Sequence, residues 1–440
     1  MFDDTIAYPQ AVRSTRFAMT LDIRSARRSL PWMLAALSMI GPFSIDAIFP
    51  SFPLIGRHFG VDDVALQQLV SAYLLAYAVM CLFHGAISDA IGRRPVIIVG
   101  MLVYALASAC AALSTSFTML LICRGVQGLS AGSGIVVGRA VVRDTLEGPA
   151  AQKLMSRVLM IFGIAPAIAP MVGGQLLGVG GWHGMFWVLT LFAVLLAVAV
   201  YYWLEESHPP SRRIPFAPRT QLASYIGFGR DRPFWPLLIS SSVNFAGLFL
   251  YIASAPRIVR ELLHLSAQGF PWLFIPVVAG MVNGAWLSGR LAGRHGVALT
   301  VGLGYTIMLM ACALHLLAAL SLPQPRLPWS MLPLILQGVG VQLAFPTLTL
   351  LLLDRFPHQR GGVSSAQAFV SLLCSALVAG VLSPLLSASM LHLALCATAM
   401  TLIGWLSWYW YGAVTKHRMD RQRVQPDAEA ELQADIVEPR

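Results

Sequence analysis

Charged residues are scarce in this chain of 440 residues. Asp, Glu, Lys and Arg together make up 11% of it, whereas hydrophobic residues make up 57% and the mean hydropathy is +0.70. Soluble domains carry about 25% charged residues and about 45–50% apolar ones. This composition excludes a soluble enzyme, a disordered protein and a secreted disulfide scaffold, and it predicts a protein whose solvent is lipid.

Cysteine is also scarce, and the motifs of nucleotide and metal chemistry are missing. The six cysteines all fall inside apolar runs and none forms a CxxC pair, so we interpret them as packing residues and expect no metal site. The chain has no GxxxxGK[ST] loop for ATP and no HExxH or Ser/His/Asp grouping. We therefore expect no enzyme and no cofactor. A channel would need repeated polar rings, which the sequence does not offer.

Long apolar runs are what the chain does have. Because about 20 apolar residues span a bilayer as one helix, we expect an all-α integral membrane protein of twelve transmembrane helices. The polar tails, 1–30 and 412–440, are expected to lack structure. The predicted spans are 31–51, 67–87, 95–114, 117–140, 155–177, 183–204, 234–256, 270–289, 297–320, 331–353, 363–386 and 389–411.

The basic residues predict the orientation of these helices. With the N-terminus in the cytoplasm, the cytoplasmic segments hold 25 of the 30 Lys and Arg residues, the outer loops hold 4 and one lies inside a span. Cytoplasmic loops of membrane proteins collect Lys and Arg. We therefore expect a multi-pass membrane protein with both termini in the cytoplasm. The net charge of +10 then needs no nucleic-acid partner.

Two halves are visible in the sequence. The connection 205–232 separates the six spans of 31–204 from the six spans of 233–411. A Gln-Gly pair occurs in the fourth span (Gln127) and in the tenth (Gln337), and each Gln is followed 17 residues later by an Asp. This repetition favours a duplicated transporter. The alternative is a chance similarity between apolar sequences.

Two charges lie inside the predicted spans, and both are costly there. Asp46 is the one acid inside a span and Arg124 is the one clearly intramembrane base; both fall roughly 7–10 Å below the outer face. We expect them to pair, with Asp46 as the coupling-proton site and Arg124 tuning its proton affinity. The alternative is a fixed salt bridge that never titrates. Pro50 leaves the Asp46 carbonyl without its helical donor, which predicts a kink or loosening there.

Several motifs occur in a recognisable order. Residues 85–95 read GAISDAIGRRP, residues 124–132 RGVQGLSAG and residues 163–174 GIAPAIAPMVGG, while 46–53 read DAIFPSFP and 251–256 YIASAP. Together they resemble the major facilitator superfamily, and specifically its Bcr/CflA branch of drug:proton antiporters. The chain departs from the family in the motif of the fifth span, which has Ala-Pro where many antiporters have Gly-Pro. It also departs in its second half, where Arg290 replaces the acid of the loop and Leu334 replaces the arginine.

The resemblance implies a fold and roles for these motifs. It implies two six-helix bundles around a central cavity that opens alternately to each side. The loop between the second and third spans would latch the outward-facing state through Gly85, Asp89, Gly92, Arg93 and Arg94. The antiporter motif of the fifth span would set a bend and close packing against the eighth span through Gly163, Pro166, Pro170, Gly173 and Gly174.

Candidate substrate contacts are polar and aromatic residues on the expected cavity helices. Aromatic walls with scattered polar groups suit amphipathic ligands. The alternative for each residue is a hydrogen bond between helices. The candidates are Tyr73, Tyr77, Asn244, Tyr251, Gln337, Gln342 and Gln367.

The predicted function is secondary active transport. We expect a monomer that exports small amphipathic drugs in exchange for protons, with the proton gradient as its energy source. The alternative is proton-coupled export of a specific metabolite, such as an amino acid or a sugar, on the same fold.

Overall fold

The fold was analysed in a computed structural model that describes residues 30–146, 148–291, 297–322, 324–357 and 359–437. Every regular element in these ranges is a helix. Eleven helices of the described chain are long and apolar enough to cross a membrane. The protein is therefore an all-α membrane protein, as its composition predicts.

The N-terminal half contains five such helices. The first runs over Leu30–Phe59 and is broken, with a 3₁₀ turn η1 (Phe49–Ser51) leading into α2 (Phe52–Phe59). The others are α3 (Asp63–Ile91), α4 (Arg93–Ala112), α5 (Phe117–Thr145) and α6 (Gly148–Trp203).

The long α6 consists of two spans. Gly180 and Gly181 have non-helical dihedrals, and the φ of +58° at Gly181 is one that glycine adopts without strain. This break divides α6 into arms 148–179 and 182–203, which correspond to the predicted spans 155–177 and 183–204. Counting the arms separately gives the twelve spans that the sequence predicts.

The connection between the halves holds η2 (Pro210–Arg212) and α7 (Pro218–Gly229). The seventh span of the C-terminal half is interrupted and comprises α8 (Phe234–Val243), α9 (Ala246–Ala253), α10 (Ala255–Arg257) and the π-helix η3 (Ile258–Leu262). After η4 (Ala267–Gly269), the remaining elements are α11 (Pro271–Leu291), α12 (Val297–Ser321), α13 (Pro333–Asp354), α14 (Arg360–Leu377), η5 (Val378–Leu382), α15 (Ser383–Leu386) and α16 (Met390–Val437).

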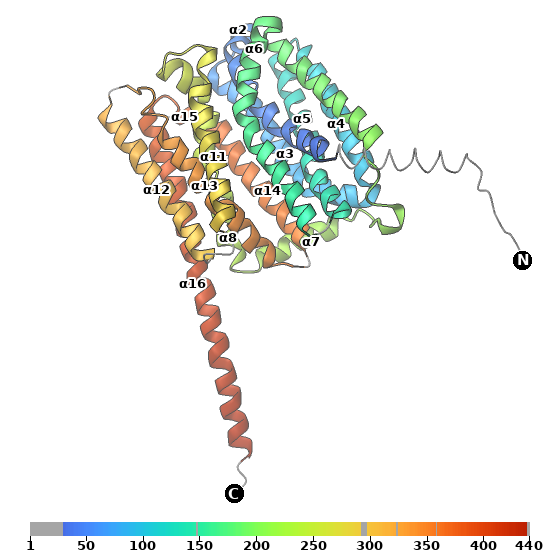
Figure 1. The fold of residues 1–440 in the computed structure, drawn as a ribbon, viewed down its shortest axis with the longest axis vertical. Coiled ribbons are helices and arrows are strands. Elements are labelled where there is room, and N and C mark those ends of the chain that lie inside the picture. Colours follow the sequence, from blue (N-terminus) through green and yellow to red (C-terminus); the bar gives the residue numbers. More distant parts are fainter. Residues whose placement is uncertain (1–29, 147, 292–296, 323, 358, 438–440) are drawn as a thin grey trace, which may run out of the picture.

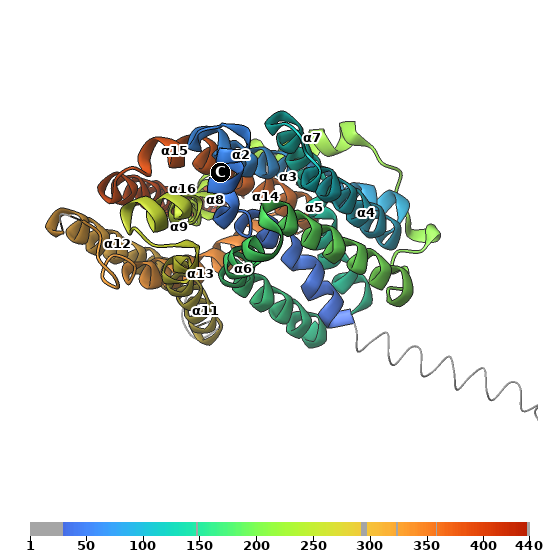
Figure 2. The same cartoon turned by 90° about the horizontal axis from the view of Figure 1, so that it is seen from above.

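Each half packs as its own bundle, and the two bundles lie side by side (Figures 1 and 2). Within the first, α3 packs on α5 and α4 on both α5 and α6; within the second, α13 packs on α11 and α12, and α16 on α8 and α12. The bundles meet where α3 contacts α14 and where α6 contacts α11. Large apolar side chains such as Leu106, Leu317 and Leu385 are 62–70% exposed, as expected of a surface solvated by lipid.

Two connecting segments differ from the sequence prediction. The central connection contains the 12-residue helix α7, which begins with Pro218 at a position that favours helix initiation. Instead of ending at 411, α16 continues as a helix to Val437 and projects from the end of the bundle where α7 lies, away from α2 (Figure 1). The predicted N-terminal tail lies outside the described residues, apart from Leu30.

Candidate functional site

The first span changes conformation at Asp46. The α-helix covers 30–46, a turn follows at 47–48, and Pro50 lies in the 3₁₀ turn η1. The predicted loosening of the helix around Pro50 is therefore confirmed. The Asp46 side chain is 3% exposed, and its Oδ1 is buried without a hydrogen-bond partner. A carboxyl group thus sits at a backbone break inside the protein.

Arg124 of α5 is fully buried and held by its neighbours. Its Nη1 donates to Ser44 Oγ at 2.9 Å and to Gln127 Oε1 at 2.8 Å, and its Nε donates to the Leu69 carbonyl at 3.1 Å. The guanidinium lies over the Tyr73 ring, 4.6 Å from its centroid. Its Nη2 is buried without a partner. The charge is therefore distributed among polar atoms and an aromatic face.

The expected ion pair between Asp46 and Arg124 is not formed. Arg124 contacts Ser44, which lies two residues before Asp46 on the same helix. Successive residues of an α-helix are separated by about 100°, so residues two apart point to roughly opposite sides. The two charges belong to adjacent helices at similar depth, but they do not face each other in this conformation.

Glycine allows the close packing that holds Arg124 under Tyr73. A Cβ on Gly128, one turn after Arg124, would lie 2.1 Å from the Tyr73 carbonyl oxygen, so α3 and α5 approach to backbone contact there. Gln127, next to it, donates to Ser108 Oγ of α4 at 2.7 Å. The motif of the fourth span thus joins α3, α4 and α5 around one buried cation.

Residues 85–94 comprise the end of α3, Gly92 and the start of α4, and they contribute to a compact ionic cluster; we call this segment the latch loop. Arg93 pairs with Asp89 at 2.5 Å and with Asp144 of α5 at 2.9 Å. It also donates to Ser88 Oγ at 2.6 Å. Gly92 has a φ of +115°, which a side chain would strain. We call the end of the molecule that contains the latch loop the latch end. The opposite end is called the far end.

Glu206, which the sequence analysis did not identify, completes this cluster. Its Oε1 accepts from the Arg93 backbone N–H at 2.9 Å and its Oε2 from that of Arg94 at 3.2 Å. A carboxylate in this position caps the first turn of α4 and complements its dipole. The latch loop thereby ties the second, third and fourth spans to the segment after the sixth. The sequence signal was a Glu-Glu pair directly after an apolar span.

The partners of the latch loop lie in the N-terminal half and the central connection. Within the described chain, the side-chain hydrogen bonds and ion pairs of Asp89, Arg93 and Arg94 all stay in the N-terminal half; Arg94 donates to the Tyr201 carbonyl. Asp354, the counterpart of Asp144, pairs instead with the nearby Arg360 at 2.8 Å. The second copy of the loop lies partly outside the described residues, which omit 292–296.

The antiporter motif packs against the first span. A Cβ on Gly173 would lie 2.2 Å from the Ala47 carbonyl, directly beside the break at Asp46. Pro166 and Pro170 lie inside α6, and Gly174 follows on the same helix. Gly163 is also helical, but its surroundings lie outside the described side chains. The helix α6, whose first arm carries the motif, contacts α11, which is the eighth span.

The cavity candidates in the N-terminal half are neighbours. The Tyr73 and Tyr77 rings lie 6.2 Å apart in an edge-to-face arrangement, as residues one helical turn apart should. Tyr73 is fully buried, and Tyr77 is 8% exposed. The Tyr73 ring therefore packs against Arg124 and is not accessible, whereas Tyr77 keeps a small exposed area.

The C-terminal candidates mostly bond within their own bundle. Gln337 binds Thr401 at 3.4 Å and accepts from the Cys312 thiol at 3.7 Å, and Gln367 donates to Thr349 at 2.9 Å. These are the hydrogen bonds between helices that the sequence left open as the alternative. Two candidates do retain unpartnered polar atoms, Asn244 Oδ1 and the Tyr251 hydroxyl, and Gln342 lies beside Gly284.

A second cation with a buried side-chain atom lies further along α5. Arg139 lies in α5, which extends to Thr145 instead of ending at the predicted residue 140, and its Nε is buried without a partner. With Ser38 and Gly134, it lines a small cavity of about 10 Å³.

The bundles are joined at the far end by side chains from the first turns of α3. Gln67 donates to the Ala253 carbonyl at 2.9 Å, Gln68 to that of Gly380 at 3.0 Å and Ser71 to that of Ala376 at 3.0 Å. All three acceptors belong to the C-terminal bundle. At the latch end, Tyr225 of α7 donates to the Leu82 carbonyl at 2.8 Å.

Comparison with known proteins identifies this architecture. The family model described as Major Facilitator Superfamily matches residues 34–379. The chain belongs to the major facilitator superfamily. Multidrug resistance protein D of Escherichia coli K12 is 29% identical over 392 residues, which cover 88% of this chain and 96% of that protein. The Bicyclomycin resistance protein homolog of Haemophilus influenzae is 25% identical over 65% of this chain and 72% of its own length.

Solved structures of the superfamily share the fold. A bacterial homolog of the human lysosomal transporter Spinster, in an inward-facing and occupied conformation, has a TM-score of 0.66 with 17% identity over 89% of this chain and 97% of its own. A D-xylose–proton symporter has a TM-score of 0.66 with 15% identity over 86% and 97%. This member of the superfamily is thus a multi-pass membrane transporter, not an enzyme, and several of its relatives are named as multidrug resistance proteins.

Proposed function

We propose that this protein exports small amphipathic drugs from the cytoplasm in exchange for protons, by alternating access. The observation that carries the proposal is Asp46, a buried carboxyl group with an unpartnered oxygen at a helix break, next to the packing contact of Gly173. Burying an unpaired carboxylate is costly, and binding a proton or a cation removes that cost. The Asp46 carboxyl group can therefore bind a proton and a cation in turn. The multidrug relatives support drugs as the cargo.

The contacts between the bundles support alternating access. Gln67, Gln68 and Ser71 close the far end, while the latch loop makes its bonds within the N-terminal half and the central connection. This arrangement suits a state open toward the latch end, which we expect to face the cytoplasm because the basic residues gather there in the sequence. Opening the far end would break the three hydrogen bonds, and closing the latch end would bring the C-terminal bundle to the latch loop.

Arg124 is assigned a positioning role for Asp46. Because it holds Ser44 on the helix that carries Asp46, a movement of Arg124 or of Ser44 transmits directly to the break. The proton and the drug need not touch Arg124. We also propose that the protein is a monomer in the bacterial inner membrane and that both of its termini lie in the cytoplasm.

Drug accumulation in a bacterial strain that lacks its own efflux pumps tests the cargo. Cells that express the chain should accumulate less of at least one amphipathic dye or antibiotic than cells that express Asp46→Asn at equal abundance. Equal accumulation for every compound would contradict drug export and would favour the alternative, export of an amino acid or sugar. Direct uptake of labelled amino acids and sugars into inverted vesicles would then test that alternative.

A further inference from the structure

Two exposed arginines lie at the latch end of the C-terminal bundle, in the turn 229–233 that joins α7 to α8. They are Arg230 and Arg232, and neither forms an ion pair with another described residue. Asp231, which lies between them, pairs with Arg355 at the end of α13; Arg355 Nη2 donates to Asp231 Oδ1 at 2.7 Å. The turn therefore presents two positive charges, because the charge of the acid between them is already balanced.

Hydrogen bonds fix the conformation of this turn. The backbone N–H groups of Arg230 and Asp231 donate to carbonyls three residues earlier, at 3.2 and 3.1 Å. Trp235 Nε1 donates to the Gly229 carbonyl at 2.8 Å and so closes the turn from the side of α8. The backbone that carries the two arginines is therefore ordered before any ligand binds, which lowers the entropic cost of binding.

The turn lies at the boundary between lipid tails and headgroups. Trp235, which follows it in α8, is exposed, and α8 packs beside the membrane-spanning part of α16 (Figures 1 and 2). At the latch end that part of α16 carries the exposed residues Tyr409 and Trp410. Trp and Tyr side chains gather at this boundary in membrane proteins. Because α8 runs away from the latch end, the turn before it lies on the headgroup side of Trp235.

The extension of α16 adds basic residues on the same side of the boundary. Beyond Trp410 the helix continues to Val437, and Asp420 is the one acid of its sequence between residues 411 and 426. Clusters of Lys and Arg that directly follow a transmembrane helix attract anionic lipids. The packing of α8 on α16 joins this segment to the turn, although the two are distant in the sequence. The basic residues of the segment are Lys416, Arg418, Arg421 and Arg423.

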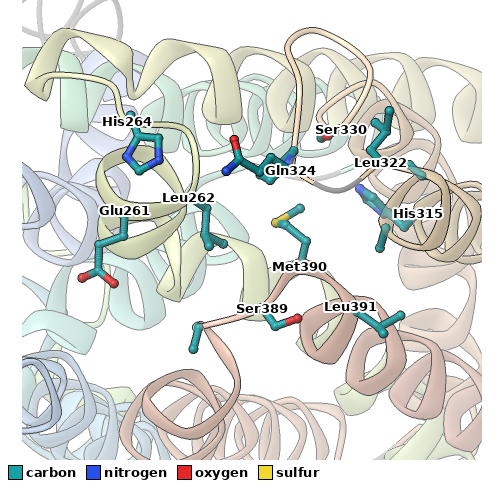
Figure 3. Close-up of a pocket in the computed structure, with 14 residues that line it drawn as sticks. Glu261, Leu262, His264, His315, Leu322, Gln324, Ser330, Ser389, Met390 and Leu391 are labelled. Carbon is teal, nitrogen blue, oxygen red and sulfur yellow. The ribbon is translucent and has the colours of Figure 1, made fainter.

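The hollow at the opposite end of this bundle lacks such charges. A cavity of about 240 Å³ lies there, with Glu261, His264 and His315 among its lining residues (Figure 3). None of the fourteen described residues that line it is a lysine or an arginine. This cavity therefore offers an anionic headgroup no counter-charge, whereas the turn 229–233 does.

We propose that the turn 229–233, together with the basic segment 416–423, binds the headgroup of an anionic phospholipid. The guanidinium groups of Arg230 and Arg232 donate to its phosphate oxygens, because the planar fork of arginine matches a phosphate in charge and geometry. The acyl chains lie along the exposed apolar surface of α8 and α16. A zwitterionic headgroup is disfavoured because its own ammonium group offsets the attraction. This binding does not depend on the proposed cargo or on Asp46.

Native mass spectrometry of the detergent-purified full chain tests the proposal, with dioleoylphosphatidylglycerol as the anionic probe and dioleoylphosphatidylcholine as its zwitterionic match. We expect the wild type to bind the anionic lipid at least tenfold more tightly than the zwitterionic one. The double variant Arg230→Gln/Arg232→Gln should lose at least fivefold in affinity for the anionic lipid. The control Arg212→Gln/Arg219→Gln removes the same charge from two other exposed arginines of the central connection and should bind as the wild type does.

Thermal unfolding without added lipid shows that the compared variants are folded. The double variant Lys416→Gln/Arg418→Gln tests the basic segment separately and should bind the anionic lipid at least twofold more weakly. The proposal is overturned if the two lipids bind equally well, or if folded Arg230→Gln/Arg232→Gln binds the anionic lipid as the wild type does. It is also overturned if the control loses as much affinity, because net charge would then explain the binding. Asp46→Asn should bind the anionic lipid normally, so failure here and failure of proton-coupled export are distinguishable.

Discussion

Arg124 donates a 2.9 Å hydrogen bond to Ser44, two residues before Asp46 on the first span. This bond links the buried cation to the helix that carries the buried carboxyl group, without joining the two charges. A direct ion pair would compete with the proton for Asp46. The observed arrangement leaves Asp46 Oδ1 free while the position of its helix still depends on Arg124.

Replacing Arg124 with lysine should stop transport although it preserves the charge. The ammonium group of lysine is a single donor centre and cannot serve the Leu69 carbonyl, Ser44 and Gln127 together. We expect drug efflux to fall at least tenfold at equal abundance. The control is Arg360→Lys, whose side chain is 54% exposed and should tolerate the change. Wild-type efflux by Arg124→Lys would exclude the positioning role.

Gly128→Ala should destabilise the N-terminal bundle. Its Cβ would lie 2.1 Å from the Tyr73 carbonyl, so α3 and α5 must separate, at a cost of roughly 1–3 kcal/mol. Gly125→Ala, three residues earlier on α5, meets nothing within 4 Å and should be neutral or slightly stabilising. Thermal unfolding of the two variants in the same detergent measures the difference; equal midpoints would mean that the close approach is not required.

Glu206→Ala should weaken the latch loop. The variant leaves the first two backbone N–H groups of α4 without their acceptor, which typically costs about 1 kcal/mol. Glu205→Ala removes the same charge from the exposed neighbouring residue and serves as the control. Hydrogen exchange should increase at the start of α4 in Glu206→Ala alone. The same increase in both variants would indicate a general charge effect instead of capping.

A disulfide between Ser71→Cys and Gly380→Cys should trap the far end closed. A Cβ on Gly380 would lie 2.8 Å from the Cβ of Ser71, so a separation of about 1 Å brings the pair into the range of a disulfide. Oxidation should abolish efflux by the double variant and a reductant should restore it, whereas Ser71→Cys alone should be insensitive to oxidation. Undiminished efflux by the crosslinked protein would mean that the far end need not open.

Much of the fold follows from the sequence, because apolar run length alone determines where helices can cross a bilayer. The details that could not be predicted depend on where helices end and which way side chains point. The helix α5 continues to Thr145, beyond the predicted end at residue 140, and the Nε of Arg139 is buried. Arg124 contacts Ser44 and not Asp46 because of how the first span and α5 are rotated about their axes relative to each other. This rotation cannot be read from a single sequence. Glu206 caps α4 from more than 100 residues away.

The stacking of His315 on Tyr251 was also beyond prediction from the sequence. The two residues lie in different spans, and which faces two spans turn toward each other depends on packing that a single sequence does not show.

Proton movement through Asp46 is the central claim, and energised inverted membrane vesicles test it directly. Addition of a transported drug should collapse the pH gradient in wild-type vesicles and leave it intact in Asp46→Asn vesicles of equal protein content. Asp46→Glu, which keeps a carboxyl group, should retain part of the response. A drug-induced collapse of equal size in Asp46→Asn would contradict the account, because the proton would then cross the protein without this carboxyl group.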